Sequence, residues 1–360
     1  MSFDKIIGQQ RPIEILQRAL EHRRVPHAYL FNGPEGVGKE ALAIEFAKAL
    51  NCSASQQRPC NSCSNCARTG RFEYPDFQFI FPAPKAVTVQ DERQVLDSLV
   101  KNPYARKKLW ASPTVSIDKI RELRRTSMIK PMEGKRVVVI TEAHSMTTDA
   151  ANSLLKILEE PPEAMHIILI TSKINALLPT IISRCQEIRF SALADDDIKQ
   201  GLIDKEGIEP DKAGVIARIS QGSYGRALQC LDEEFENTRN LAMDFIRVSL
   251  KAPSAQFELV DRILADYDKK TVKEIINLLL IWFRDSMNYM QANPEMQKYI
   301  VNRDKMELLQ KFTNAFSKIE FEKIFQRLEN SIQLLDKNVQ MNILLFVLLI
   351  KLQECYLVKR

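Results

Sequence analysis

The sequence lacks the features that would place it in a membrane or outside the cell. The longest apolar run near the C-terminus covers residues 343–350, whereas a membrane span needs about 20 residues, so we expect a buried helix there. Residues 1–11 contain no apolar stretch flanked by basic residues, and no secretory signal is predicted. Internal repeats and low-complexity segments are also missing. These absences favour a globular protein of the cytoplasm without a membrane partner.

A strong excess of one charge is missing as well. There are 51 Lys and Arg residues against 46 Asp and Glu, and the net charge of +5 is by itself weak evidence for nucleic-acid binding. Seven cysteines are present, but without an export signal the reducing cytosol disfavours a disulfide framework. The length of 360 residues predicts about two or three domains.

The first half of the chain alternates between expected strands and helices. Strands are predicted at residues 27–31, 77–81, 136–140 and 166–171. Helices are predicted within residues 4–22, after residue 38, over 117–126 and over 151–158. Residues 82–113 fit no single element, and their prolines suggest an irregular excursion. The alternation predicts an α/β parallel sheet, and from about residue 192 the pattern becomes helical to the end.

A glycine-rich segment after the first strand matches a phosphate-binding loop. Gly33, Gly36 and Gly38 let backbone N–H groups converge on phosphate. Lys39 can reach the terminal phosphates, but Glu40 stands where a hydroxyl normally holds Mg²⁺. ATP or ADP binding therefore stays possible, while hydrolysis is disfavoured. The alternative is a glycine turn that never meets nucleotide.

The strand at residues 136–140 ends without the usual metal-binding carboxylate. In phosphate-loop ATPases this strand ends in an Asp that serves the metal, and here Thr141 takes that place. Glu142 could still orient a water, or it is simply a solvated loop carboxylate. The loss of both metal-holding groups at one site favours a protein that descends from an ATPase and no longer hydrolyses ATP.

Four of the cysteines are spaced as C-x7-C-x2-C-x2-C: Cys52, Cys60, Cys63 and Cys66. Four thiolates suffice for a tetrahedral structural zinc site without an open position, and hence without catalysis. Free thiols or a labile redox cluster are the alternatives. The spacing predicts a small zinc module at about residues 52–66, inserted into the α/β domain.

Basic residues outside the loop are the last candidates for function. Arg184, within Ser-Arg-Cys, could act as a finger on a neighbour's nucleotide, or it forms a salt bridge near Glu187. Arg226 follows a glycine-rich turn at residues 222–225 and starts a helix. The predicted helix at 117–126 could approach DNA phosphates or carry a solvated basic face. Its basic residues are Lys119, Arg121, Arg124 and Arg125.

Together these segments resemble the clamp-loader branch of the AAA+ ATPases. The resembling segments are residues 6–9 (Ile-Ile-Gly-Gln), 27–34, the phosphate loop, the four cysteines, 152–162, 183–185 and 222–227. The cysteine insertion and the Leu-Glu-Glu-Pro-Pro helix end are highly specific for the bacterial gamma/tau and delta-prime types. The resemblance covers roughly residues 3–230, and the helical C-terminal third is compatible with it.

The resemblance implies a fold and a set of partners. It implies an AAA+ P-loop domain at residues 1–191, a helical lid domain at 192–234 that carries Arg226, and a helical collar domain at 235–360 that assembles a pentamer. The partners would be gamma/tau and delta subunits and, through the complex, the sliding clamp and primer-template DNA. In this family the Ser-Arg-Cys arginine, here Arg184, reaches the γ-phosphate of the neighbouring subunit.

Within this family Glu40 and Thr141 favour the non-motor delta-prime type over the hydrolysing gamma/tau type. The intact Gly-x4-Gly-Lys pattern departs from many delta-prime chains. Two alternatives stay open: an active gamma/tau-type ATPase, and a zinc-containing nucleic-acid-binding module of another pathway.

Overall fold

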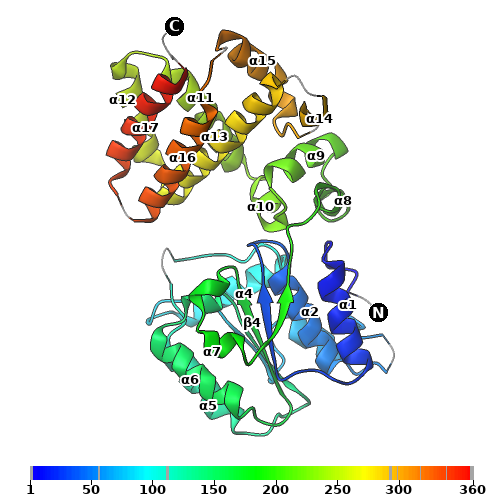
Figure 1. Cartoon of the computed structure of the whole chain (residues 1–360). Helices are drawn as coiled ribbons and strands as arrows, with labels where there is room; N and C mark the ends of the chain where they lie inside the picture. The colour runs from blue at the N-terminus through cyan, green and yellow to red at the C-terminus, as the bar shows by residue number, and fades with distance from the viewer. Residues whose placement is uncertain are drawn as a thin grey trace. The chain divides into compact units, whose positions relative to one another are not determined.

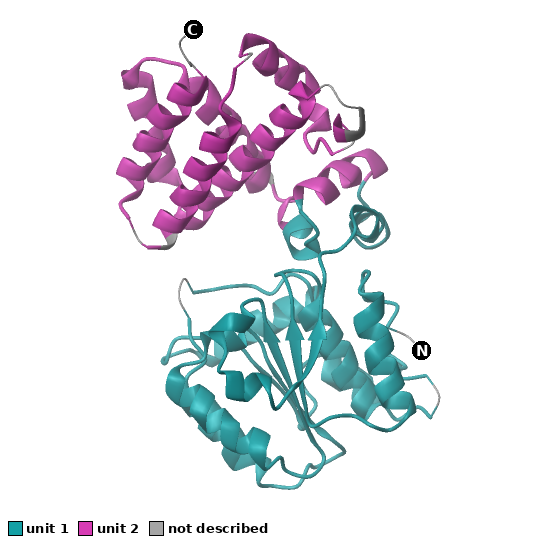
Figure 2. Ribbon diagram, in the orientation of Figure 1, with its two compact units in different colours: residues 1–208, 220–228 teal, residues 209–219, 229–360 magenta. Residues whose placement is uncertain are grey.

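The computed structural model describes residues 3–55, 57–110, 113–291, 294–297, 299–316, 318–337 and 339–356. Its backbone forms two compact units, residues 1–208 with 220–228 and residues 209–219 with 229–360 (Figure 2). Helix α8 (Asp195–Glu206) belongs to the first unit and α9 (Pro210–Ile219) to the second. The predicted lid at residues 192–234 is thus shared between the units, and the three-domain division stays a prediction.

A five-stranded parallel sheet organises the first unit. The strands are β1 (Ala28–Asn32), β2 (Phe77–Ile80), β3 (Arg136–Ile140), β4 (Met165–Thr171) and β5 (Gln186–Arg189). Their order is β2-β3-β4-β1-β5, and every pairing is parallel. The predicted α/β parallel sheet is confirmed, and β3 has the predicted bounds.

The first unit also contains helices, some of which pack on the sheet. They are α1 (Gln10–Glu21), α2 (Lys39–Asn51), α3 (Ser64–Gly70), α4 (Val89–Lys101), α5 (Ile117–Ser127), η1 (Ala143–Ser145), α6 (Thr148–Glu159), η2 (Ile174–Ala176), α7 (Pro179–Ile182), α8 and most of α10 (Tyr224–Gln229). Side chains of a strand alternate between its two faces, so each face of β1 contacts a different set of helices. Leu30 belongs to a core shared with α5, α6 and α7, and these three helices lie on the same side of the sheet in Figure 1. Tyr29 packs edge-on against Phe46 of α2, with ring centroids 5.7 Å apart.

The stretch 82–113 is less irregular than the sequence suggested, because α4 occupies its middle. The hydroxyl of Thr88 caps this helix by accepting a hydrogen bond from the backbone N–H of Asp91, at 3.1 Å. Val95 is fully buried and packs with Phe81 and Ala83. The expectation of an irregular excursion is therefore wrong for residues 89–101. Residues 111 and 112 of this stretch lie outside the described residues.

The described residues of the second unit form helices joined by loops, without any strand, as predicted for the C-terminal region. Besides α9 it contains α11 (Glu233–Ser249), α12 (Pro253–Asp266), α13 (Lys269–Met290), α14 (Pro294–Gln297), η3 (Arg303–Lys305), α15 (Met306–Ala315), α16 (Phe321–Asp336) and α17 (Met341–Tyr356). The 22-residue helix α13 packs against α11, α15 and α16. None of the described helices combines the length and the apolar character needed to cross a membrane.

Candidate functional site

The phosphate loop joins β1 to α2, as the sequence predicted. Gly36 and Gly38 have φ angles of +71° and +100°, a region in which a side chain is strained. A Cβ atom on Gly36 would collide with Oγ of Ser223, and one on Gly38 would lie 2.8 Å from the ring of Tyr104. Both glycines are needed for the backbone conformation and for the close approach of other residues.

Lys39, the first residue of α2, points back into its own loop. Its Nζ donates hydrogen bonds to the carbonyl oxygen of Gly33 at 2.7 Å and to that of Pro34. The residue is 6% exposed, and burial lowers the pKa of Lys39 to about 8. The lysine that would reach a terminal phosphate is thus satisfied by carbonyl groups of the loop.

Glu40 and Thr141, the two departures from the ATPase pattern, lie together. The hydroxyl of Thr141, directly after β3, donates a hydrogen bond to Oε1 of Glu40. The sequence predicted that both residues replace metal-holding groups, and the fold brings them to one point between α2 and β3. The two residues therefore form a hydrogen-bonded pair at the place where phosphate-loop ATPases hold a metal ion.

A third residue completes this pair, and sequence reasoning missed it. Nε of Arg106 donates to Oε1 of Glu40 at 3.0 Å, and the Arg106 guanidinium also donates to Oε1 of Glu142. The Arg106 side chain is 8% exposed, against 19% for Glu40 and 24% for Glu142. Arg106 follows α4 in the stretch without a recognisable motif, where Arg106-Lys107-Lys108 was the sole sequence signal.

Electrostatics bind this cluster together. Burial alone would raise the pKa of Glu142, but the positive charges of Arg106 and Lys108 outweigh it and lower that pKa. Nζ of Lys108 lies 3.3 Å from Oε1 of Glu142 and 3.4 Å from Oε2 of Glu35. Burial likewise opposes the charge of Arg106, yet Glu40 and Glu142 raise its pKa. Glu142 is thus an ion-pair partner, and the reading of it as a solvated carboxylate is wrong.

The turn before α10 also contacts the phosphate loop. The backbone N–H of Gly225 donates to the carbonyl of Gly36 at 3.0 Å, and Oγ of Ser223 accepts from the backbone N–H of Arg226 at 3.2 Å. Arg226 is half-buried within α10. The helix that was predicted to carry Arg226 therefore begins beside the loop that was predicted to bind phosphate.

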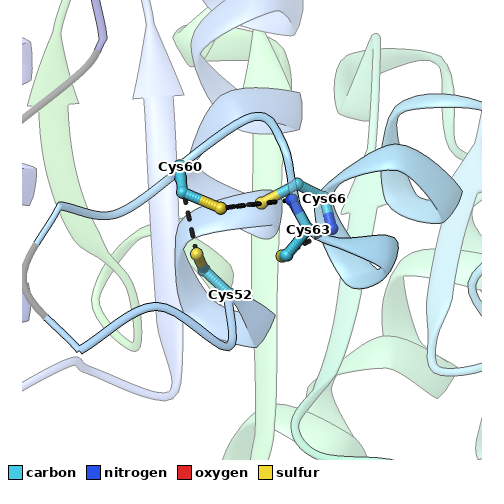
Figure 3. Close-up of side chains that lie close together, drawn as sticks. All are labelled: Cys52, Cys60, Cys63 and Cys66. Atoms are coloured by element: carbon cyan, nitrogen blue, oxygen red, sulfur yellow. Dashed lines mark hydrogen bonds between the residues drawn. The ribbon is translucent and has the colours of Figure 1, made fainter.

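The four clustered cysteines converge after α2 (Figure 3). Cys52 follows the end of α2, and the thiol of Cys63 caps α3 by accepting from the backbone N–H of Cys66, at 3.4 Å. All four Sγ atoms lie within 4.8 Å of one another, and those of Cys60 and Cys66 are 4.0 Å apart. Zn–S bonds of about 2.3 Å in a tetrahedron require sulfur atoms about 3.8 Å apart. The donor set and its spacing therefore fit one zinc ion.

Arg184 follows α7 at the surface of the first unit. Its guanidinium donates to the carbonyl of Thr180 at 3.0 Å and to Oε1 of Glu159 at 2.8 Å, and its side chain is 35% exposed. Glu187 instead accepts from Arg189 at 3.0 Å. Of the alternatives, an intramolecular salt bridge is present, but its partner is Glu159, the last residue of α6, and not Glu187.

The basic helix α5 is partly neutralised. Lys119 pairs with Glu92 of α4 at 2.6 Å, and Arg121 lies 3.9 Å from Asp118 on its own helix. Arg124 and Arg125 are exposed. This arrangement weakens the case for a strongly basic DNA-binding face on α5.

The features so far define a class: an α/β protein with a phosphate-loop sequence, in which Glu40 and Thr141 stand where phosphate-loop ATPases hold a metal ion. Comparison with known proteins identifies the family. The family described as DNA polymerase III, delta subunit, matches residues 8–194. The chain belongs to this family, that of the clamp-loader subunit delta-prime, as the sequence motifs indicated.

The chain is similar to several individual proteins. DNA polymerase III subunit delta' of Bacillus subtilis is 28% identical over 293 residues, which cover 81% of this chain and 80% of that protein. DNA polymerase III subunit tau of the same organism is 32% identical over 238 residues, or 64% of this chain and 37% of tau. Among solved structures, a gamma subunit-related protein from Thermotoga maritima aligns over 96% of this chain and 99% of its own, with a TM-score of 0.45 and 18% identity.

Proposed function

We propose that this chain is a non-motor, delta-prime-type subunit of a bacterial clamp loader of the AAA+ class. It would act in the cytoplasm with gamma/tau and delta subunits and help to load the sliding clamp on primer-template DNA. Family membership and the delta' relative, which matches over most of both lengths, support the assignment. The observation that carries it is the Glu40–Arg106–Glu142 network at the place where a motor subunit needs a metal ion.

The network is incompatible with the usual route of phosphoryl transfer. Phosphate-loop ATPases hold Mg²⁺ through a hydroxyl at the start of the loop helix and a carboxylate at the end of the strand. Here Glu40 and Thr141 occupy those positions and bind each other. The runner-up, an active gamma/tau-type ATPase, would need both groups to be replaced.

The contribution of this subunit to catalysis would be Arg184. A guanidinium is always charged and can grip phosphate oxygens with two hydrogen bonds. The Arg184–Glu159 pair is 35% and 49% exposed, and pairs of this kind contribute about 0–1 kcal/mol. This small cost would let Arg184 leave Glu159 and reach a nucleotide bound by a neighbouring motor subunit.

The second unit would hold the assembly together as a collar. Helix α17 buries Leu345, Leu348 and Leu352 inside the unit. Its other face also carries apolar side chains: Ile343 is 55% exposed and Ile350 is 39% exposed. Val347, which is 38% exposed, lies between them, and the three residues recur at helical spacing; a contiguous exposed apolar stripe supports docking of gamma/tau and delta subunits there.

The cysteine cluster would hold one structural zinc ion. A tetrahedral site made of four thiolates has no open coordination position, so the metal would staple the segment after α2 to α3 and take no part in catalysis.

Reconstitution tests the proposed role. The chain is mixed with gamma/tau and delta subunits, and DNA-stimulated ATP hydrolysis and clamp loading are measured. We expect Arg184→Ala to leave assembly intact and to lower both rates; arginine fingers contribute about 10³–10⁵ in rate where they act alone, and one finger among several in a ring should contribute less.

Arg189→Ala is the matched control, since this arginine is 81% exposed and also pairs with a glutamate of the first unit. The control should load clamps at the wild-type rate. Wild-type loading by the assembled Arg184→Ala complex would refute the finger, and failure of the wild-type chain to join the complex would refute the subunit assignment.

A further inference from the structure

The segment after α4 returns to the phosphate loop and packs on it. The backbone N–H of Tyr104 donates to the side-chain oxygen of Asn102 at 3.1 Å, which starts a turn. The hydroxyl of Tyr104 then accepts a hydrogen bond from the backbone N–H of Ile7 at 2.8 Å, and the residue is 8% exposed. Its ring lies edge-on to Tyr224, with centroids 5.0 Å apart. Tyr104 is therefore fixed from three directions.

Tyr104 lies at the point where a nucleotide's phosphates would enter. Gly38 precedes the first residue of α2, and the N-terminus of a helix after a glycine loop is the usual phosphate-binding position. A Cβ on Gly38 would be 2.8 Å from the Tyr104 ring, so the ring is in close contact with the loop backbone there. From the other side, Ser223 and Gly225 approach Gly36.

Arg106 continues this segment into the position of the metal ion. A divalent cation in a phosphate-loop ATPase lies between the loop helix and the end of the neighbouring strand. The Arg106 guanidinium lies between Glu40 of α2 and Glu142, which follows β3, and it pairs with both carboxylates. It thus supplies positive charge at the place where the divalent cation would supply it.

We propose that residues 104–108 are a built-in occupant of the nucleotide site, in which Arg106 takes the place of the divalent cation and Tyr104 covers the phosphate-binding turn. The chain then keeps its α/β unit ordered without nucleotide and does not take up Mg-ATP. Two observations agree: Lys39 is already bound to loop carbonyls, and Glu40 with Glu142 would repel a triphosphate if Arg106 left. This inference goes beyond the role in a loader, because it concerns the chain without partners.

Mg-ATP binding could be prevented by residues 104–108 or simply by the loss of the metal-holding groups at positions 40 and 141. Variants in which those two groups are restored distinguish the two causes. The probe is the fluorescent nucleotide mant-ATP, titrated with Mg²⁺ into the full-length chain. The wild type should show no saturable binding. The variant Glu40→Ser/Thr141→Asp should bind only weakly, because Arg106 can still pair with the new carboxylate at position 141 and with Glu142. Adding Arg106→Ala to that variant should tighten binding by at least about tenfold.

The control adds Arg93→Ala to the same restored variant. Arg93 belongs to α4, its side chain is 50% exposed, and it pairs with Asp97 at 2.9 Å, so its removal should not change binding. If the Arg106→Ala variant does not fold by circular dichroism, Arg106→Gln takes its place, because the amide keeps a hydrogen-bond donor without the charge.

Either of two results overturns the proposal. One is saturable, Mg²⁺-dependent mant-ATP binding by the wild-type chain. The other is equal affinity of the restored variants with and without Arg106. Neither result depends on assembly or clamp loading, so this proposal and the proposed function fail separately.

Discussion

Replacing Arg106 by Ala should destabilise the first unit more than any exposed ion pair could. The side chain is 8% exposed and bridges Glu40 and Glu142, which are 19% and 24% exposed beside it. Breaking a buried pair by removing one partner costs about 3–5 kcal/mol, and partial access of water to the two carboxylates favours about 3 kcal/mol. For a domain of about 150–250 residues, 3 kcal/mol lowers the unfolding temperature by about 6–12 °C.

The loss should depend on pH in a defined direction. The charges of Arg106 and Lys108 outweigh burial and lower the pKa of Glu142 below its usual 4.5. A carboxyl whose pKa is lower in the folded state stabilises the fold above its unfolded pKa, and this contribution disappears as pH falls through the folded pKa. The stability difference between wild type and Arg106→Ala should therefore be full at neutral pH and shrink below about pH 4.5.

Chemical denaturation followed by circular dichroism at several pH values measures this difference. Arg93→Ala is the control and should cost about 0–1 kcal/mol, because its ion pairs are half exposed. The double variant Arg106→Ala/Glu40→Gln should recover part of the loss, since one of the unpaired charges is removed as well. An Arg106→Ala chain that unfolds at the wild-type midpoint would show that the guanidinium does not hold the site together.

Three further predictions concern the remaining sites. Metal analysis should find about one zinc per chain, and Cys63→Ser should lose it while Cys230→Ala keeps it; a metal-free chain with an unchanged unfolding temperature would exclude a structural role. The isolated chain should not hydrolyse ATP, and Mg²⁺-dependent turnover that Lys39→Ala abolishes would assign a motor subunit instead. Glu159→Ala should change the unfolding free energy by less than about 1 kcal/mol, because its pair with Arg184 is half exposed; a larger loss would mean that Arg184 has a structural role.

Much of the first unit could be predicted from the sequence because its signals are local. The β-branched run at residues 136–140 has high strand propensity and is buried on both faces, so it forms β3 with the predicted bounds. Gly36 and Gly38 adopt positive φ angles, which few other residues tolerate, so the loop could be recognised from its glycines. The cysteine spacing likewise predicted a cluster, and the four Sγ atoms do converge.

Helix α4 was missed because its local signals are weak. Val95 and Leu99 are its buried residues, and prolines flank the stretch in which it lies. Two apolar positions are too few to show a helical periodicity in the sequence. The intramolecular partner of Arg184 also differs from Glu187, which the alternative interpretation had named. Glu187 is near in sequence, but it lies on β5, where it accepts a hydrogen bond from Asn32 of β1, and the end of α6 brings Glu159 to Arg184 instead.

The sequence by itself determined that Glu40 and Thr141 stand where the motif of phosphate-loop ATPases has its metal-holding groups, since both residues lie at fixed distances from recognisable motifs. The ion-pair partner of Glu40 and Glu142 was decided by tertiary structure. Arg106 is 66 residues from Glu40 and 36 from Glu142 in the chain, and no periodicity or motif connects them. Their meeting depends on the path of the segment after α4, which is set by long-range contacts such as that of Tyr104 with Ile7. An ion pair between distant segments exists because the fold has already brought them together, and for that reason local sequence patterns do not reveal it.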